Sequence, residues 1–237
     1  MSIFAETGAE NEKHNLEESY VELKTRGNTT WGVMKWAYQI KFDSKVNLFD
    51  KIYDVNLKVF GKFNVYNALS AMIVCSMLGV PTDKIIEYIC TFLGVQGRVE
   101  RLKLDKKTIF IDYAHTPYAL ENLLLFLSKN KKNSQKLITV FGCGGNRDAS
   151  KRSLMGNIAS KYSDVIILTT DNCRNEPLEK IISDIKKGID RDRQTLIIND
   201  RKEAIEYAIM NHSANDIILL CGKGHENYEI DKFGKRY

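Results

Sequence analysis

The 237 residues contain no apolar run close to the roughly 20 residues that are needed to span a bilayer. The start, MSIFAETGAENEKHN, lacks the basic stretch and apolar core of a secretory signal, so we expect no such leader. Only five cysteines occur, an odd and widely spaced set. This argues against a disulfide framework or a structural zinc site and fits a reducing cytoplasm. A phosphate loop of the form G-x-x-x-x-G-K-[ST] is also absent.

Neither the composition nor the charge is unusual. Hydrophobic residues make up 43% of the chain and charged residues 27%, as in ordinary globular proteins, and the length suffices for one large or two modest domains. The formal net charge of +5 is mild. It suits a small anionic substrate, but a solvated lysine-rich surface explains it equally well, and we expect no nucleic-acid or membrane partner.

The pattern of the chain changes near VQGRVE (95–100), which we expect to be a hinge or domain boundary. Before it, the segments 36–42 and 53–61 have the β-branched and aromatic content of short antiparallel strands. Two segments with apolar residues at helical spacing follow, and Thr82 is expected to cap the second of these helices.

Beyond the expected boundary, apolar strands alternate regularly with amphipathic helices. Thr116 and Asp200 are the expected N-caps of two of these helices. Strands that are apolar throughout, each followed by an amphipathic helix, predict an α/β domain with a mostly parallel sheet covered on both faces. The expected strands are 108–112, 136–142, 164–170, 194–199 and 216–222.

Ligands in such sheets bind beyond the carboxyl ends of the strands, so the loops at those ends form the candidate site. Each loop alone is a weak signal. GCGGNRD is not a dinucleotide fingerprint, because Arg147 takes the place of the third glycine, and alone it indicates a tight turn. Asp112 and His115 alone indicate helix capping. The loops are DYAHTP (112–117), GCGGNRD (142–148), TDNCRNEP (170–177), NDRKE (199–203) and GKGHE (222–226).

Taken together, these loops match one family. The motifs DYAHTP, FGCGGNRD, KR..MG, DN.R and GKGHE occur in this order. With them the chain resembles the C-terminal part of the Mur ligases, in particular the UDP-N-acetylmuramoyl-tripeptide synthetases of the diaminopimelate-adding type. GKFNVYNALSA and GVQGRVE resemble the junction between that family's central and C-terminal domains. The resemblance is strong over residues 60–236 and loose over residues 1–60.

The resemblance implies two domains. Residues 1–96 would be the end of the central ATP-binding domain, and residues 97–237 a Rossmann-like C-terminal domain that is cut short at its end. The family's phosphate loop, its Mg²⁺ ligands, its carbamylated lysine and its UDP-sugar domain would all lie outside this sequence. We therefore expect a partial chain without turnover of its own, and a separately encoded N-terminal half is one partner that fits this expectation.

Four residues match positions that hold ATP in the family. An amide can read adenine edges, a guanidinium can meet phosphate or ribose oxygens, and a carboxylate can accept from ribose hydroxyls. Without the resemblance we would interpret the asparagine as a helix cap and the arginine as part of a hinge salt bridge. The four residues are Asn64, Arg98, Asp112 and His115.

Seven further residues match positions that contact meso-diaminopimelate: Arg147, Asp171, Asn172, Cys173, Arg174, Gly222 and Glu226. The far end of that amino acid is a zwitterion, whose carboxylate Arg174 can pair with bidentately and whose ammonium can donate to Glu226. L-lysine has no second carboxylate, so Arg174 favours diaminopimelate. Cys173 departs from the family, which has proline there, and this change loosens φ and restores a backbone donor.

The implied reaction is ATP-dependent amide-bond formation in peptidoglycan precursor synthesis. The γ-carboxylate of D-glutamate in UDP-N-acetylmuramoyl-dipeptide is phosphorylated, and the diaminopimelate amine attacks the acyl phosphate. We expect no nucleophile and no metal ligand in this sequence, whose role is to position the amine. Two alternatives stay open. One is a binding module without activity, and the other is a lysine-adding or folylpolyglutamate-synthetase-like relative, against which Arg174 and GKGHE count.

Overall fold

The computed structural model describes residues 5–6, 19–26, 29–34, 42–48, 51–104 and 107–236. The chain divides into two compact units, Met1–Gly94 and Val95–Tyr237. The boundary expected from the sequence, between residues 96 and 97, lies two residues further along. The candidate site loops all belong to the second unit.

The first unit combines a five-stranded sheet, in the order β1-β3-β2-β4-β5, with two helices. Buried side chains of β5 and both helices, among them Val55, Met72 and Ile85, form its core. The elements are β1 (Ala5–Glu6), β2 (Ser19–Arg26), β3 (Thr29–Met34), β4 (Phe42–Leu48), β5 (Lys51–Leu57), α1 (Lys62–Met77) and α2 (Thr82–Thr91).

The structure confirms one strand expected in this unit and contradicts one expected helix cap. The strand expected at 53–61 is present as β5, paired antiparallel with β4, whereas the strand expected at 36–42 lies outside the described residues except for Phe42. The expectation that Thr82 caps α2 is wrong. Pro81 is the N-cap residue, with an extended backbone, and no side chain caps the helix. Thr82 already has helical geometry, so its hydroxyl cannot act from the N-cap position.

The second unit is built on a six-stranded sheet in the order β10-β9-β8-β11-β7-β6. All neighbours are parallel except β6, which runs antiparallel to β7 at the edge. The predicted α/β class with a mostly parallel sheet is therefore confirmed. The strands are β6 (Glu100–Leu104), β7 (Lys107–Asp112), β8 (Leu137–Phe141), β9 (Val165–Leu168), β10 (Gln194–Ile197) and β11 (Ile217–Cys221).

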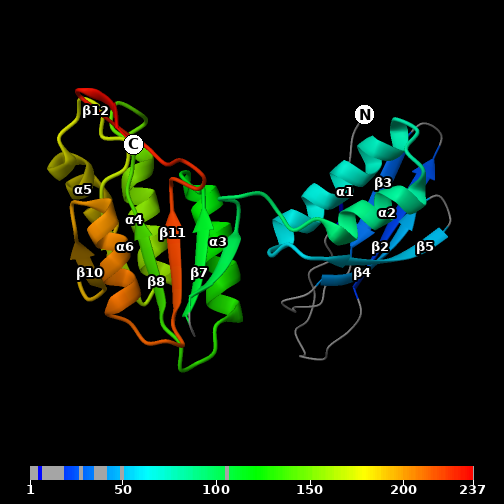
Figure 1. Ribbon diagram of the computed structural model, residues 1–237, viewed down its shortest axis with the longest axis horizontal. Coiled ribbons are helices and arrows are strands. Elements are labelled where there is room, and N and C mark those ends of the chain that lie inside the picture. Colours follow the sequence, from blue (N-terminus) through cyan, green and yellow to red (C-terminus); the bar gives the residue numbers. More distant parts are fainter. Residues whose placement is uncertain are drawn as a thin grey trace. The chain divides into compact units, whose positions relative to one another are not determined.

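Helices cover both faces of this sheet (Figure 1). The chain moves across the sheet in one direction from β7 to β10 and then returns to β11. Right-handed crossovers therefore place α3, α4 and α5 on one face and α6 on the other. The contacts agree, because α4 touches α3 and α5, while α6 packs on β8, β9 and β11. The helices are α3 (Pro117–Asn130), α4 (Ser150–Tyr162), α5 (Leu178–Lys186) and α6 (Arg201–Met210).

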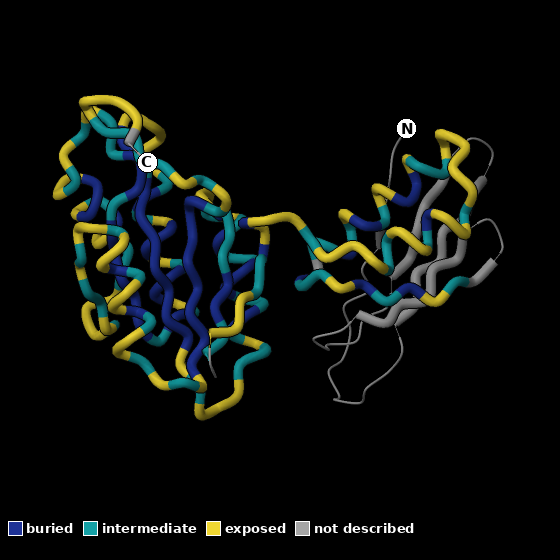
Figure 2. The backbone as a smooth tube through the Cα atoms, viewed as in Figure 1, coloured by how far each residue is buried: buried dark blue, intermediate teal, exposed yellow. Residues whose placement is uncertain are grey.

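The central strands are the most deeply buried part of this unit, as Figure 2 shows. Every residue of β8, β9 and β11 is buried, as expected for strands covered on both faces. The two expected caps are also confirmed. The Thr116 hydroxyl accepts a hydrogen bond from the Ala119 amide, and the Asp200 carboxylate accepts one from the Glu203 amide. These caps fix the starts of α3 and α6 directly after site loops.

Three strands of this unit were not predicted from the sequence: the edge strand β6 and the hairpin of β12 (Glu229–Asp231) and β13 (Gly234–Arg236). The hairpin follows the GKGHE loop and bridges back to Arg174. Within the part of the chain that the structure describes, no helix is long and apolar enough to cross a membrane.

Candidate functional site

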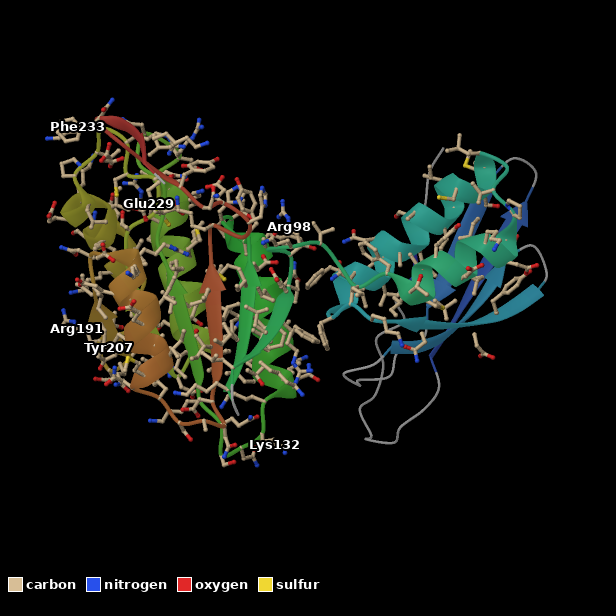
Figure 3. The ribbon with its side chains drawn as sticks, viewed as in Figure 1. Arg98, Lys132, Arg191, Tyr207, Glu229 and Phe233 are labelled. Atoms are coloured by element: carbon tan, nitrogen blue, oxygen red, sulfur yellow. The ribbon has the colours of Figure 1, made fainter. Side chains whose placement is uncertain are left out.

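The predicted site loops meet at one edge of the second unit's sheet. The strands β7, β8, β9 and β11 run parallel, so their carboxyl ends share that edge. In Figure 3, Arg98 and Glu229 lie toward this end of the sheet and Lys132 toward the opposite end. Backbone hydrogen bonds join the loops to one another: the Gly145 amide donates to the Asn172 carbonyl, and the Gly222 amide donates to the Asp112 carbonyl.

Lys223 lies at the centre of the contacts between the 170–177 and 222–226 loops. Its Nζ donates to Oδ1 of Asn172 and to the Tyr228 carbonyl, both at 2.7 Å. It lies 3.6 Å from a carboxylate oxygen of Asp171 and 3.8 Å from one of Glu226. Burial lowers the pKa of Lys223, while the neighbouring carboxylates favour its charged form. The ammonium thus holds the 170–177 and 222–226 loops together.

Glu226 joins both loops to β7. Its Oε2 accepts from the Asn172 side-chain amide at 3.3 Å, and its Oε1 accepts from the Tyr113 hydroxyl at 3.2 Å. Gly222 packs so closely that an added Cβ would lie 3.0 Å from Oδ2 of Asp171. The structure therefore brings Asp171, Asn172, Gly222 and Glu226 together.

Arg174 is held by neutral backbone groups. Its Nη1 donates to the carbonyls of Gly145, at 3.0 Å, and Asn172, at 3.1 Å. Its backbone has a φ of 51°, and its amide donates to the Ile230 carbonyl of β12. Among the described residues Arg174 forms no ion pair, so the donors on Nη2 and Nε remain available to a ligand.

Arg147 and Cys173, the other two residues that match diaminopimelate-contacting positions, differ in their surroundings. Arg147 is exposed, and its side chain makes no hydrogen bond or ion pair with the described part of the chain. Cys173 is half-buried, and its sulfur lies 3.2 Å from the Thr170 hydroxyl. The Cys173 carbonyl faces Gly145, where an added Cβ would lie only 1.9 Å away. Position 145 therefore admits no side chain while this loop keeps its path.

Asp112, at the carboxyl end of β7, accepts two backbone hydrogen bonds. Its Oδ2 accepts from the Val99 amide at 2.8 Å, and its Oδ1 accepts from the Ala114 amide at 2.6 Å. Burial raises the pKa of Asp112, and these two hydrogen bonds oppose the rise. The carboxylate thus fixes the turn after Arg98 to the end of β7, and each oxygen retains a lone pair for a further donor.

Arg98 and His115 flank the ring of Tyr113. The Arg98 guanidinium lies 4.5 Å from the ring centroid, and the His115 ring meets the tyrosine edge-on at 4.8 Å. Both side chains are exposed. Nδ1 of His115 lies 2.9 Å from the Tyr113 carbonyl. Because a carbonyl only accepts, Nδ1 is the donor and Nε2 of a neutral ring is left as an acceptor.

Asn64 belongs to the first unit, whereas Arg98, Asp112 and His115 belong to the second. Its Nδ2 donates to the Phe60 carbonyl at 2.8 Å, and its Oδ1 accepts from Asn67 at 3.1 Å. The capping interpretation of Asn64 is wrong, because Gly61 is the N-cap residue of α1, Asn64 lies within the first turn, and no side chain caps this helix. One hydrogen and one lone pair of the amide are left for a ligand.

Sequence reasoning missed several residues that hold these loops. Lys223 lies in the GKGHE motif and Arg152 in the KR..MG motif. Neither motif indicates that its basic side chain is buried and paired with a carboxylate. Arg201, at the start of α6, donates to the Thr170 and Cys221 carbonyls at 3.1 and 2.5 Å. Its position in NDRKE does not indicate that its side chain contacts the 170–177 loop and the end of β11. Across the described residues, no group of three or more His, Cys, Asp or Glu side chains could hold a metal ion.

Comparisons with known proteins identify the family of the chain. Residues 97–224 match the family described as Mur ligase, glutamate ligase domain. A UDP-N-acetylmuramoyl-L-alanyl-D-glutamate--2,6-diaminopimelate ligase of Rickettsia rickettsii is 47% identical over 220 residues, covering 92% of this chain and 44% of the relative. A ligase of the same name from Caldanaerobacter subterraneus subsp. tengcongensis is 39% identical over 233 residues, covering 91% and 47%. A solved structure of a ligase of that name has a TM-score of 0.59 at 32% identity, covering 94% of this chain and 44% of its own.

The mostly parallel sheet with helices on both faces defines the second unit as an α/β domain. The chain belongs to the Mur ligase family, and its second unit contains that family's C-terminal, glutamate ligase domain. The chain spans less than half the length of the curated relatives described above.

Proposed function

We propose that this chain is part of a UDP-N-acetylmuramoyl-L-alanyl-D-glutamate--2,6-diaminopimelate ligase, a cytoplasmic acid–amino-acid ligase of peptidoglycan precursor synthesis. Relatives of that name match 91% and 92% of the chain. The substrates would be ATP, the UDP-linked dipeptide and meso-diaminopimelate. The first unit, which carries GKFNVYNALSA, would be the end of the central ATP-binding domain.

The observation that carries this proposal is the environment of Arg174. Two carbonyls hold its Nη1, while the rest of its guanidinium fork has no anionic partner among the described residues. A planar fork of this kind matches a carboxylate bidentately. Glu226 lies on the adjoining loop, held by Asn172 and Tyr113, and can accept from an ammonium. The pair therefore suits the zwitterionic end of diaminopimelate.

L-lysine fits this arrangement less well, because it has the distal ammonium and lacks the distal carboxylate. With lysine bound, Arg174 would lose water without gaining an anion. Sites built to pair a polar group discriminate strongly against analogues that lack it. Asp171, Asn172, Cys173, Gly222 and the exposed Arg147 complete the proposed amino-acid site.

The nucleotide site proposed for this chain consists of Asn64, Arg98, Asp112 and His115. The side chains of the second unit fit such a ligand: Arg98 is exposed and forms no ion pair in the described part of the chain, and both Asp112 oxygens can accept another donor. ATP, when bound, would supply the phosphoryl group that activates the substrate carboxylate. No Mg²⁺ ligand is assigned to the described residues, since they contain no suitable cluster.

The role of these residues in the reaction is positional. Arg174 and Glu226 would hold the distal end of diaminopimelate, which leaves the other amine free to approach the activated γ-carboxyl group of the dipeptide. Fixing the amine in this way lowers the barrier by proximity and orientation. Because the 237 residues have no phosphate loop, we propose that they do not turn over ATP alone. Dipeptide-dependent ADP formation by the purified chain would contradict this.

Calorimetric titration of the chain with meso-diaminopimelate and with L-lysine tests the proposed substrate. We expect diaminopimelate to bind more tightly, and Arg174→Ala to weaken it by about 2–5 kcal/mol, or some 30- to several-thousand-fold. Binding of lysine should change little. Arg191→Ala, which alters an exposed arginine before β10, serves as the matched control. Equal affinities for the two amino acids, or an equal loss for both in Arg174→Ala, would contradict the assignment.

A further inference from the structure

A fully buried arginine on α4 links the two loops that carry Arg147 and Arg174. Arg152 has no exposed surface, and its guanidinium pairs bidentately with Glu176 through Nη1 and Nη2, both at 2.7 Å. A second carboxylate, that of Asp184 on α5, accepts from Nη1 at 3.0 Å. This pairing holds the pKa of Glu176 far below its usual range and raises that of Arg152. Both groups therefore stay ionised throughout the neutral range.

The Arg152–Glu176 pair also holds the backbone of the 142–148 loop. Nη2 of Arg152 donates to the Gly144 carbonyl at 3.2 Å, and Oε2 of Glu176 accepts from the Asn146 amide at 3.0 Å. The Asn146 side chain in turn accepts from the Asn175 amide at 3.0 Å. The Arg152–Glu176 ion pair thus holds the 142–148 loop to the 170–177 loop.

The position of Arg174 depends on that same stretch of backbone. Its Nη1 donates to the carbonyl of Gly145, the residue between Gly144 and Asn146. Gly145 has no freedom to move toward the 170–177 loop, because the Cys173 carbonyl already fills the place of a Cβ. A shift of the 144–146 backbone would therefore carry the carbonyl that orients the guanidinium with it.

We infer that Arg152 and Glu176 are positioning residues that set the orientation of the Arg174 guanidinium for its carboxylate ligand. This inference rests on the proposed function for the identity of the ligand, though not for the geometry. Neither residue touches the ligand; both act through the Gly144–Asn146 backbone. The competing explanation is that the pair only neutralises a buried charge and stabilises the fold.

Substitution of Asp184 distinguishes these two explanations. Asp184 accepts from the same Arg152 guanidinium, so Asp184→Asn removes a half-buried carboxylate just as Glu176→Gln does. Only Glu176, however, also holds the Asn146 amide. A purely structural pair predicts similar effects of both substitutions, whereas positioning predicts that only Glu176→Gln disturbs Arg174.

The test uses the 237-residue chain and two measurements. The first is the ligand-free NMR spectrum of the arginine guanidinium groups, with Arg174→Lys identifying the Arg174 signals. The second is the dissociation constant for meso-diaminopimelate. In Glu176→Gln we expect the Arg174 Nη1 protons to lose their slow, hydrogen-bonded character and the affinity to fall at least about tenfold. Asp184→Asn should leave the Arg174 signals unchanged and alter the affinity less than about twofold, although both variants lower the melting temperature.

The two measurements keep the inference separate from the proposed function. If the wild-type chain binds no diaminopimelate, the proposed substrate fails while the NMR comparison still decides the positioning role. If Glu176→Gln leaves the Arg174 signals unchanged, or if both variants alter them alike, the inference is wrong. Should Glu176→Gln not fold, Arg152→Lys replaces it. Lysine keeps the charge but cannot reach both carboxylates and the Gly144 carbonyl with a planar fork, so the same loss of Arg174 order is expected.

Discussion

The hydroxyl of Tyr113 donates a hydrogen bond to Oε1 of Glu226 at 3.2 Å. The ring of the same tyrosine lies beneath the Arg98 guanidinium, 4.5 Å from the centroid. One side chain therefore joins a residue of the proposed nucleotide site to a residue of the proposed amino-acid site. Both ends of this contact lie within the second unit.

Replacing Tyr113 by phenylalanine should separate these two roles. The ring under Arg98 remains, but Glu226 loses a donor, so we expect binding of meso-diaminopimelate to weaken by about 1–2 kcal/mol, or some 5- to 30-fold. Calorimetric titration measures the change. Tyr118→Phe is the control, because Tyr118 lies exposed on α3 and should leave the affinity unchanged. An unchanged affinity in Tyr113→Phe would show that the hydroxyl does not hold Glu226 in its binding position.

Lys223→Met should destabilise the second unit strongly. The substitution leaves Asp171, Asn172 and Glu226 without their shared cation, and removing one partner of a buried pair costs about 3–5 kcal/mol. Urea denaturation should show this loss. Lys202→Met, at an exposed helical position 4.0 Å from Glu206, should change the free energy of unfolding by less than about 0.5 kcal/mol. Similar losses in both variants would contradict the central role of Lys223.

Gly97→Ala should destabilise the turn that Asp112 holds. An added Cβ would lie 2.2 Å from the backbone nitrogen of His225, and the φ of 69° already disfavours a side chain. We expect a loss of about 2–4 kcal/mol in the free energy of unfolding, combining overpacking with backbone strain. Gly79→Ala provides the control, because that glycine has a similar φ of 81° and nothing within 4 Å. Equal shifts of the melting temperature in the two variants would show that the steric contact with His225 contributes nothing to the loss.

Glu229→Gln should make stability less dependent on pH. Burial raises the pKa of Glu229, and its Oε1 is buried without a hydrogen-bond partner among the described residues. The folded state therefore holds this proton more tightly than the unfolded state, and stability falls as pH rises through the raised pKa. At neutral pH the glutamine variant should unfold at higher urea concentration than wild type, and this difference should shrink below the ordinary glutamate pKa. A constant difference at all pH values would contradict it.

The arrangement of the second unit could be predicted because each of its parts has a local signal in the sequence. Apolar strands, capped helices such as the one after Thr116, and polar residues at strand ends all stand out along the chain. Parallel strands bring their carboxyl ends to one edge, so the meeting of Asp171, Asn172 and Glu226 also follows. The prediction that Thr82 caps α2 failed because a threonine after proline serves equally well as a first helical residue.

Other features depend on tertiary contacts that no spacing reveals. Arg152 lies in a helix whose sequence suggests an ordinary amphipathic face, and only the packing of α4 against α5 shows that its charge is buried. Lys223 could equally have been a solvated lysine in a glycine-rich turn. The edge strand β6 alternates weakly, with its last three residues exposed, and so resembles a loop. Asn64 lies within the first turn of α1, and its hydrogen bond to the Phe60 carbonyl is a contact that the residue type alone does not indicate.

Arg152 and Arg174 both contact the 142–148 and 170–177 loops, but protein carboxylates in the described part of the chain pair only with Arg152. Carboxylates neutralise Arg152, so its charge is cancelled inside the protein. Neutral carbonyls hold Arg174, and no carboxylate of the described residues forms an ion pair with it. An anion that approaches this guanidinium therefore meets a charge that no described carboxylate pairs with, and this attraction weakens as ionic strength rises. Selection of the ligand thus begins at a distance, before any hydrogen bond can form.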